Sequence, residues 1–343
     1  MKKFLLLACL FCWALPISAA EQTLYFFNWS EYLPEQVLEQ FSEETGIKVV
    51  YTTYDSNEAM YAKLKLLEGG GYDLAVPSTY YVNKMRREQL LLPIDKQQLG
   101  NYRNLDPQLL NRPFDPDNAY SIPYLWGSTG LGVDSAVVDP SRLQSWSDLW
   151  NPDFKGQVLL TNDVREVFGM ALLALGYSGN STDEVEIKAA YEKLTGLMPN
   201  VRVFNSDSPK LPFLAGEVSV GMLWNGEAFL ARQENPEIRY IYPREGAMLW
   251  MDNLVIPKGA RNAAAAHQLI DFLLRPEVAR LISEEIGYAT PNAAALELMD
   301  EEVRSDPTVY PAAADLEKAE FQLDIGEAVV VYEKYWEMLK AGR

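Results

Sequence analysis

A regular alternation of strand-like and helix-like segments near the amino-terminal end most constrains the fold of this chain. The apolar run TLYFFNW at residues 23–29 is typical of a strand, and a helical pattern follows it at 34–44. A second strand is predicted at 47–54, a second helix at 56–70 and a short buried strand at 72–78. This order predicts an α/β fold in which helices cover both faces of a sheet.

The remaining sequence continues the α/β pattern over a length of 343 residues, which suggests about two domains. Two strands that carry aromatic residues, near 122–134 and 247–256, are natural crossings between such domains. A long amphipathic run at 262–288 is interrupted by Pro276, and a closing helix is predicted at 325–342. Open sheets of this kind bind ligands at the carboxyl ends of their strands.

The first twenty residues have the pattern of a secretory signal peptide. Lys2 and Lys3 precede an apolar stretch at 4–15, and the small residues Ser-Ala-Ala at 18–20 form a cleavage site. We expect cleavage after residue 20 and export of the mature protein. The apolar stretch is short for a membrane span, and no later segment is long and apolar enough for one, so we expect the mature protein to be soluble.

Composition excludes several kinds of chemistry. Both cysteines, Cys9 and Cys12, lie in the predicted signal peptide, and the single histidine is His267. Cysteine nucleophiles, zinc sites and histidine-dependent triads are therefore not expected. The net charge of −18 argues against a nucleic-acid partner, because phosphate binding needs a basic surface. An acidic surface favours the approach of a cation, although it also serves solubility.

Several stretches together resemble a known family. They are FSEETGIKV, NWSEY, VPSTYYV, SIPYLWG, TNDVREVFGMALLALGYS, GEVSVGMLWNGEA, MLWMDNL and IDFLLRPEVARLISEEIGYATPN. In this order the chain resembles the solute-binding proteins of bacterial ABC transporters, and among them the periplasmic proteins that bind spermidine and putrescine. The resemblance implies the two-lobed, type II periplasmic binding protein fold, with a ligand cleft between lobes joined by crossing segments. Lobe one would comprise 21–126 and 252–301, and lobe two 127–251 and 302–343.

The resemblance also implies a function without catalysis. The protein would bind a polyamine in the periplasm and deliver it to an inner-membrane ABC permease that a separate ATPase drives. It would act as a monomer, with no cofactor, no metal and no nucleic acid. A polyamine keeps its ammonium groups charged at pH 7, so its site needs carboxylates at the amine spacing and apolar walls between them. Aromatic faces cover methylenes and attract cations.

Three carboxylates are candidates for such a site. Asp163 and Glu166 are three residues apart, so they share a face if they lie on a helix. The same spacing is typical of a helix start, and the sequence alone leaves capping and binding open. Asp252 lies two residues after Trp250 in a predicted strand, so both side chains point to the same side. On such a helix the spacing of Arg165 turns it away from the face that Asp163 and Glu166 share. The resemblance implies that all three acids bind the ligand.

Most of the 40 aromatic residues must belong to the core, and position alone does not separate core from site. Glu31 is expected to point to water and Tyr81 to pack in the interior. Together with the three acids, the resemblance selects eight further residues as ligand-binding: Trp29, Tyr32, Ser78, Tyr80, Trp224, Trp250, Tyr288 and Gln322.

Three other functions fit parts of this pattern. A glycosidase also pairs carboxylates beside aromatic rings. A ferric-ion carrier would use neighbouring tyrosines such as Tyr80 and Tyr81, because hard cations favour oxygen ligands. A receptor whose closed form reports polyamine to a membrane sensor has the same cleft. Each alternative has its own test. Binding of spermidine without response to oligosaccharides would argue against a glycosidase. A tyrosinate colour with Fe(III) would support a ferric-ion carrier, and capture of a partner would support a receptor.

Overall fold

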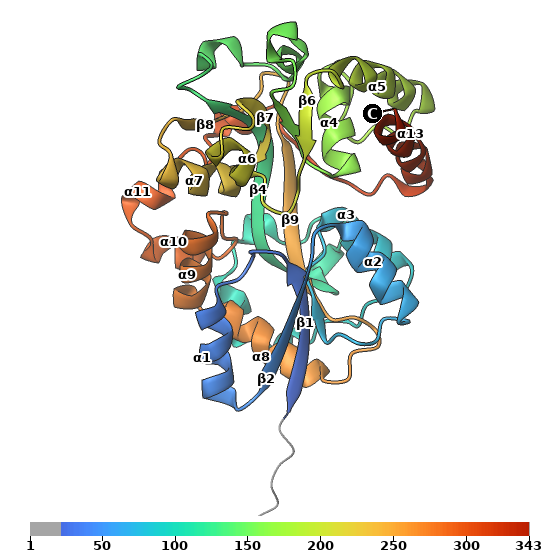
Figure 1. Cartoon of the computed structure of the whole chain (residues 1–343). Coiled ribbons are helices and arrows are strands. Elements are labelled where there is room, and N and C mark those ends of the chain that lie inside the picture. Colours follow the sequence, from blue (N-terminus) through green and yellow to red (C-terminus); the bar gives the residue numbers. More distant parts are fainter. Residues whose placement is uncertain (1–21, 343) are drawn as a thin grey trace, which may run out of the picture.

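The computed structural model describes residues 22–342, and the predicted signal peptide lies outside the described residues. Figure 1 shows two lobes, one above the other, joined by two long strands. The lower lobe begins with the elements predicted from the sequence: β1 (Thr23–Trp29), α1 (Glu35–Thr45), β2 (Lys48–Tyr54), α2 (Asn57–Leu66) and β3 (Leu74–Ala75). The helix that follows, α3 (Thr79–Arg87), was not predicted. The α/β class expected from the strand–helix rhythm is therefore confirmed.

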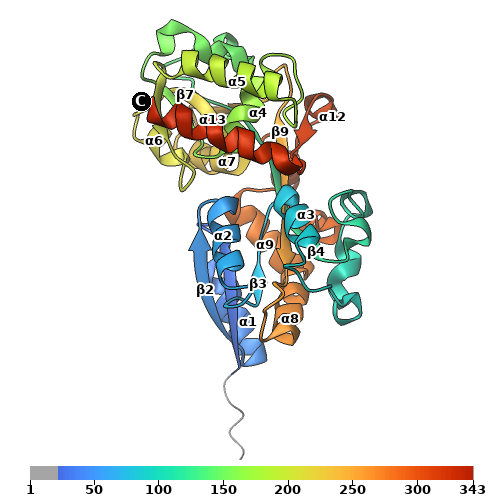
Figure 2. The same ribbon diagram turned by 90° about the vertical axis from the view of Figure 1, so that its right-hand side faces the viewer.

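The two joining strands are β4 (Ser121–Asp134) and β9 (Met248–Val255), which match the crossing segments predicted from the sequence. They pair antiparallel from Ser121 opposite Val255 to Thr129 opposite Met248. At its lower end β9 pairs with β3, and at its upper end β4 pairs with β7 (Val220–Trp224). Figure 2, turned by 90°, shows these strands passing through a narrow waist. The lobes thus share a backbone connection that can act as a hinge.

One path of hydrogen-bonded strands runs through both lobes. Its order is β2-β1-β3-β9-β4-β7-β5-β6, while β8 pairs with β4 and β10 pairs with β9. The strands not yet placed are β5 (Val158–Leu160), β6 (Val201–Phe204), β8 (Ile238–Ile241) and β10 (Glu320–Phe321). Because β1, β2 and β3 are parallel, their carboxyl ends meet at one edge, which faces the upper lobe.

Helices cover the sheet in both lobes. The lower lobe adds α8 (Ala263–Leu273), α9 (Pro276–Ile286) and α10 (Ala293–Leu298), and the break before α9 falls at Pro276 as predicted. The upper lobe carries α4 (Val164–Leu173), α5 (Glu184–Leu197), α6 (Lys210–Leu214), α7 (Asn225–Glu234), α11 (Glu301–Arg304), α12 (Ala313–Leu316) and the closing α13 (Val329–Ala341). Short 3-10 segments lie at Lys96–Gln98, Gly100–Asn104, Pro107–Leu109, Pro116–Asn118, Pro140–Arg142, Trp146–Trp150, Pro152–Phe154 and Gly326–Ala328.

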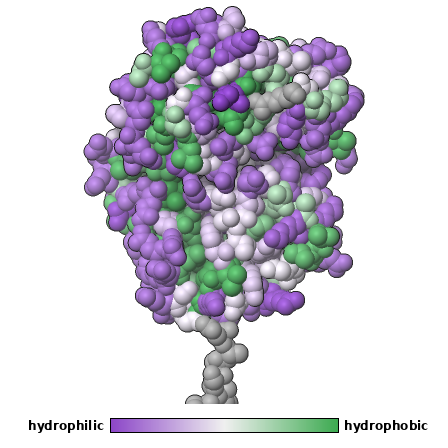
Figure 3. All heavy atoms as spheres, viewed as in Figure 1, coloured by the Kyte–Doolittle hydropathy of each residue, from purple (hydrophilic) through white to green (hydrophobic). Residues whose placement is uncertain are grey.

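Each lobe has an apolar core of its own. Phe26, Phe41 and Leu269 are buried in the lower core, and Phe168 and Tyr332 are buried in the upper core. Hydrophilic side chains cover most of the face seen in Figure 3, with smaller apolar patches between them. Within residues 22–342, no helix has both the length and the apolar character needed to cross a bilayer.

Candidate ligand-binding site

A cavity lies where the two lobes meet. Its volume is about 650 Å³, part of which is open to solvent. Six aromatic side chains line it: Trp29, Tyr32, Tyr54, Trp224, Trp250 and Tyr288. Seven acidic side chains line it: Glu31, Asp55, Asp163, Glu166, Asp207, Glu227 and Asp252. The five remaining lining residues are Ser30, Asn57, Ser78, Ser206 and Gln322.

The ends of strands and the starts of helices place these side chains. Trp29 is the last residue of β1, and Trp224 is both the last residue of β7 and the residue that precedes α7. Ser78 precedes α3, and Asp163 precedes α4. The first turn of a helix has free backbone N–H groups, which such residues can satisfy. The chain therefore delivers polar and aromatic groups to the same edge that the parallel strands create.

Asp252 lies at the centre of a buried hydrogen-bond group in the lower lobe. Its Oδ1 accepts a hydrogen bond of 2.6 Å from the Ser78 hydroxyl, and its Oδ2 accepts one of 2.7 Å from the Tyr32 hydroxyl. Only 4% of Asp252 is exposed. Burial raises the pKa of this carboxyl to about 7, although the two hydrogen bonds lower it. A cationic ligand would restore its ionised form. Trp250 lines the same cavity, as the strand alternation predicted.

Asp163 caps a helix and also lines the cavity. Its Oδ1 accepts the backbone N–H groups of Arg165 at 2.8 Å and Glu166 at 3.0 Å, so the capping interpretation is correct. Glu166 is buried, and its Oε1 accepts a hydrogen bond of 2.8 Å from the Gln322 side chain. Burial and the neighbouring Asp163 raise the pKa of Glu166 to about 8. Capping and facing the cavity are thus compatible here.

The aromatic side chains form a wall in which two groups of rings are packed together. The Tyr288 ring lies edge-on to Tyr32 and to Trp250, with centroid distances of 5.6 and 5.0 Å. Trp29 packs against Tyr54 at 4.7 Å, and its indole N–H donates to the Val76 carbonyl. Edge-on packing of this kind restrains the rings without filling the space in front of them. The wall can therefore cover an apolar stretch of a ligand.

Ten of the eleven predicted residues line the cavity, and Tyr80 does not. Its hydroxyl accepts a hydrogen bond of 3.2 Å from Asn57, whose side-chain nitrogen also donates to Ser78. The Tyr80 ring lies 5.2 Å from the guanidinium of Arg165. Arg165 itself points away from the cavity, as expected, and donates to the Leu323 carbonyl. In this structure Tyr80 supports the residues in front of it.

The sequence-based prediction missed eight lining residues. Tyr54 could have been found, because it ends β2 and pairs with Trp29 at the end of the neighbouring parallel strand. Asp55 and Asn57 follow directly. Ser206 and Asp207 belong to a loop of the upper lobe whose sequence carries no strand or helix pattern. Ser30, Glu31 and Glu227 complete the set.

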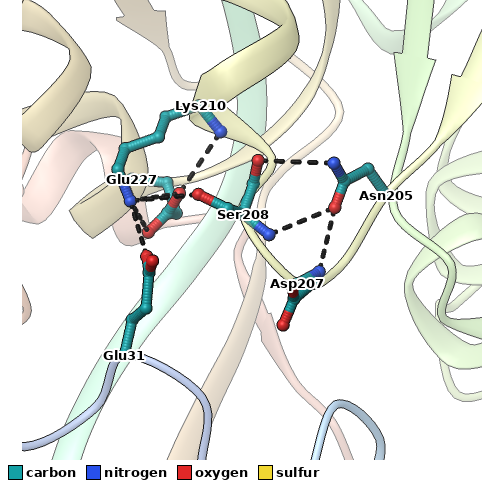
Figure 4. A network of polar contacts seen from close by, with 6 residues as sticks. All are labelled: Glu31, Asn205, Asp207, Ser208, Lys210 and Glu227. Carbon is teal, nitrogen blue, oxygen red and sulfur yellow. Dashed lines mark hydrogen bonds and ion pairs between the residues drawn. The ribbon is translucent and has the colours of Figure 1, made fainter.

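The expectation for Glu31 holds only in part, because its side chain is exposed but is also paired. It was predicted to point to water, but its Oε2 lies 2.8 Å from the ammonium of Lys210, which belongs to the upper lobe (Figure 4). The same ammonium lies 3.4 Å from Glu227. Although Glu31 is exposed, it therefore makes an ion pair between the lobes. No Lys, Arg or His is among the lining residues, so the cavity as a whole favours a cation.

His267 and Tyr81 have structural roles. The Nε2 of His267 accepts a hydrogen bond from the backbone N–H of Asp95, and its Nδ1 lies 2.7 Å from the Ala263 carbonyl. The Tyr81 hydroxyl donates to Glu58 behind the cavity. Neither residue lines the cavity, as the sequence predicted.

Two lobes that enclose an acidic, aromatic cavity at a shared hinge define a protein that captures a small solute. The chain belongs to the bacterial extracellular solute-binding protein family, whose model matches residues 36–312. This is a family of solute-binding proteins and not of enzymes, so the comparisons do not support the glycosidase alternative. The fold is the two-lobed arrangement that the resemblance implied.

Known proteins resemble the chain over nearly its full length. The spermidine/putrescine-binding periplasmic protein of Salmonella typhimurium (strain LT2) is 56% identical over 334 residues, covering 96% of both chains, and that of Escherichia coli (strain K12) is 57% identical with the same coverage. The putrescine-binding periplasmic protein PotF of E. coli is 33% identical. A solved spermidine/putrescine ABC transporter structure from Listeria monocytogenes has a TM-score of 0.90 at 40% identity, covering 94% of this chain and 100% of its own.

Proposed function

We propose that this protein binds spermidine or putrescine in the periplasm and delivers it to an inner-membrane ABC permease. The observation that carries the proposal is the lining of the cavity: seven carboxylates and six aromatic rings, without a basic side chain. Linear amines need both features, because their ammonium groups need anions and their methylenes need apolar cover. The names of the relatives support the same ligand class.

In this proposal the ligand spans the cavity between two anionic ends. Asp252, held by Ser78 and Tyr32, receives one ammonium. Glu166 and Asp163 receive an amine at the far end. The aromatic wall covers the methylenes between them. A charged hydrogen bond contributes about 1.5–3 kcal/mol, and a desolvated cation–π contact contributes about 2 kcal/mol.

Binding would close the lobes. A ligand shifts a conformational equilibrium only if it interacts differently with the two states. Here Trp29, Tyr32, Tyr288 and Asp252 would contribute from the lower side, and Glu166 with Trp224 from the upper side. The lobe boundaries predicted above, after residues 126, 251 and 301, are part of this proposal. The protein would work as a monomer after removal of its signal peptide, and the closed form would dock on the permease.

A thermal-shift series tests the ligand class. We expect spermidine and putrescine to raise the melting temperature of the purified protein, because a ligand that binds only the folded state stabilises it by mass action. 1,4-Butanediol, which has the carbon chain of putrescine but no charge, is the matched control and should give no shift. Equal shifts with putrescine and the diol, or a shift with an oligosaccharide instead, would contradict the proposal.

A further inference from the structure

Lys210 places an ammonium group of the protein beside the candidate ligand cavity. Its Nζ lies 2.8 Å from Glu31 Oε2, 3.2 Å from Ser208 Oγ and 3.4 Å from both carboxylate oxygens of Glu227. Figure 4 shows the three acceptor residues converging on this atom. Glu31 lies in the turn after β1 of the lower lobe, whereas Ser208 and Glu227 belong to the upper lobe. The cluster is therefore an ammonium site already filled by the chain.

The local structure holds Lys210 in this place. Asn205 Oδ1 accepts the backbone N–H groups of Asp207 at 2.9 Å and Ser208 at 3.1 Å, which fixes the turn in front of α6. The backbone N–H of Lys210 donates to Glu227 at 3.2 Å, so the same carboxylate contacts both ends of the residue. A lysine held by its backbone and its side chain cannot easily leave the site.

Lys210 and Glu227 form a largely buried ion pair. The side chains of Lys210 and Glu227 are only 13% and 10% exposed, so water screens their interaction less than it screens a surface pair. Glu227 and Glu31 line the cavity, but Lys210 neutralises much of their charge. Among the lining carboxylates, Asp252 and Glu166 are buried and make no ion pair of this kind, and Asp163 lies beside Glu166. The other two lining carboxylates, Asp55 and Asp207, are exposed to solvent.

We infer that Lys210 is a specificity-determining residue that limits the number of ammonium groups a ligand can bring into the cavity. This inference rests on the proposed polyamine function. Three carboxylates suit a triamine such as spermidine, whereas a fourth ammonium, as in spermine, would approach Glu31 and Glu227 and meet the positive charge of Lys210. Repulsion of this kind is a common way to reject a near-identical ligand. Without Lys210 the same carboxylates would form a fourth anionic subsite.

Calorimetric titration with spermidine and spermine tests the role of Lys210. We expect Lys210→Met, which keeps an unbranched side chain one atom shorter and removes the charge, to raise the ratio of spermine affinity to spermidine affinity at least tenfold. The ratio cancels any effect on lobe closure that both ligands share. Lys188→Met is the matched control, because Lys188 makes an exposed ion pair with Glu192 far from the lining residues and should leave the ratio unchanged.

Two further variants keep the test decisive. The double variant Lys210→Met with Glu227→Gln lacks one of the two carboxylates that Lys210 neutralises. Its gain in spermine affinity should therefore be smaller than that of Lys210→Met alone. Lys210→Gln replaces the charge with a group that can still bond to Ser208, and it repeats the measurement if the methionine variant folds poorly. An unchanged ratio in the folded Lys210 variants would overturn the inference. If the unmodified protein binds neither polyamine, the proposed function itself fails.

Discussion

Replacement of Asp252 by Asn should separate binding from stability. The side chains of Asp252 and Asn have nearly the same size, and Asn can still bond to Ser78 and Tyr32. The ammonium would, however, lose its ionised partner in the lower lobe. The loss of one charged hydrogen bond corresponds to about 1.5–3 kcal/mol, so the dissociation constant for spermidine should rise roughly 10- to 150-fold.

The stability of the ligand-free protein should change in the other direction. Burial holds the pKa of Asp252 at about 7, above its value in an unfolded chain, so the folded state binds the proton more tightly. The stability contributed by this group is present at low pH and is lost as the pH rises through about 7. Asn cannot ionise, so at pH 8 the empty variant should melt at a higher temperature than the unmodified protein.

Titration calorimetry and a melting curve at pH 8 measure both effects. Asp73→Asn is a suitable control, because Asp73 is equally buried but accepts backbone N–H groups of Tyr25, Arg261 and Asn262 and does not line the cavity. This control should lower the melting temperature and leave spermidine affinity unchanged. An Asp252→Asn variant that folds and binds spermidine as tightly as the unmodified protein would refute the assignment of Asp252 to the site.

Three further outcomes are expected. Burial raises the pKa of Asp252 to about 7 and of Glu166 to about 8 in the empty cavity, so the binding of a cation should release protons. Spermidine affinity should therefore rise between pH 6 and pH 8, and a flat pH profile in calorimetry would count against this. Asp163→Asn with Glu166→Gln keeps a good helix cap and should reduce the preference for spermidine over putrescine; equal losses for both ligands would contradict the far-end assignment. Gly226→Ala should weaken spermidine binding severalfold in the same assay, since the new Cβ would lie 2.5 Å from the Tyr288 ring, and unchanged affinity would show that the rings can yield.

The sequence predicted most of the fold because its signals are local. A Pro at position 276 ends one helix and begins another, and strand patterns at 23–29 and 47–54 depend on neighbouring residues alone. The two crossing strands were found because aromatic and apolar residues continue there over more residues than a short strand needs. These helix and strand signals are the same in any fold that buries the same side of the element.

The residues that make up the site were harder to predict from the sequence than the fold. Tyr80 follows Ser78 by two positions at the start of α3, and because successive helical residues turn by about 100°, the two side chains face different directions. The ion pair of Glu31 with Lys210 joins residues 179 positions apart across two lobes, and no local pattern marks it. Tyr54 was missed although strand pairing could have placed it beside Trp29.

The most direct test of the central claim is a calorimetric titration of the purified protein with spermidine, with glutamate as an amino-acid control. A saturable heat with one ligand per chain and a dissociation constant near or below the micromolar range, about −8 kcal/mol, is predicted for spermidine, and none for glutamate. The absence of saturable heat with spermidine at millimolar concentration, from a protein that melts cooperatively, would contradict the account.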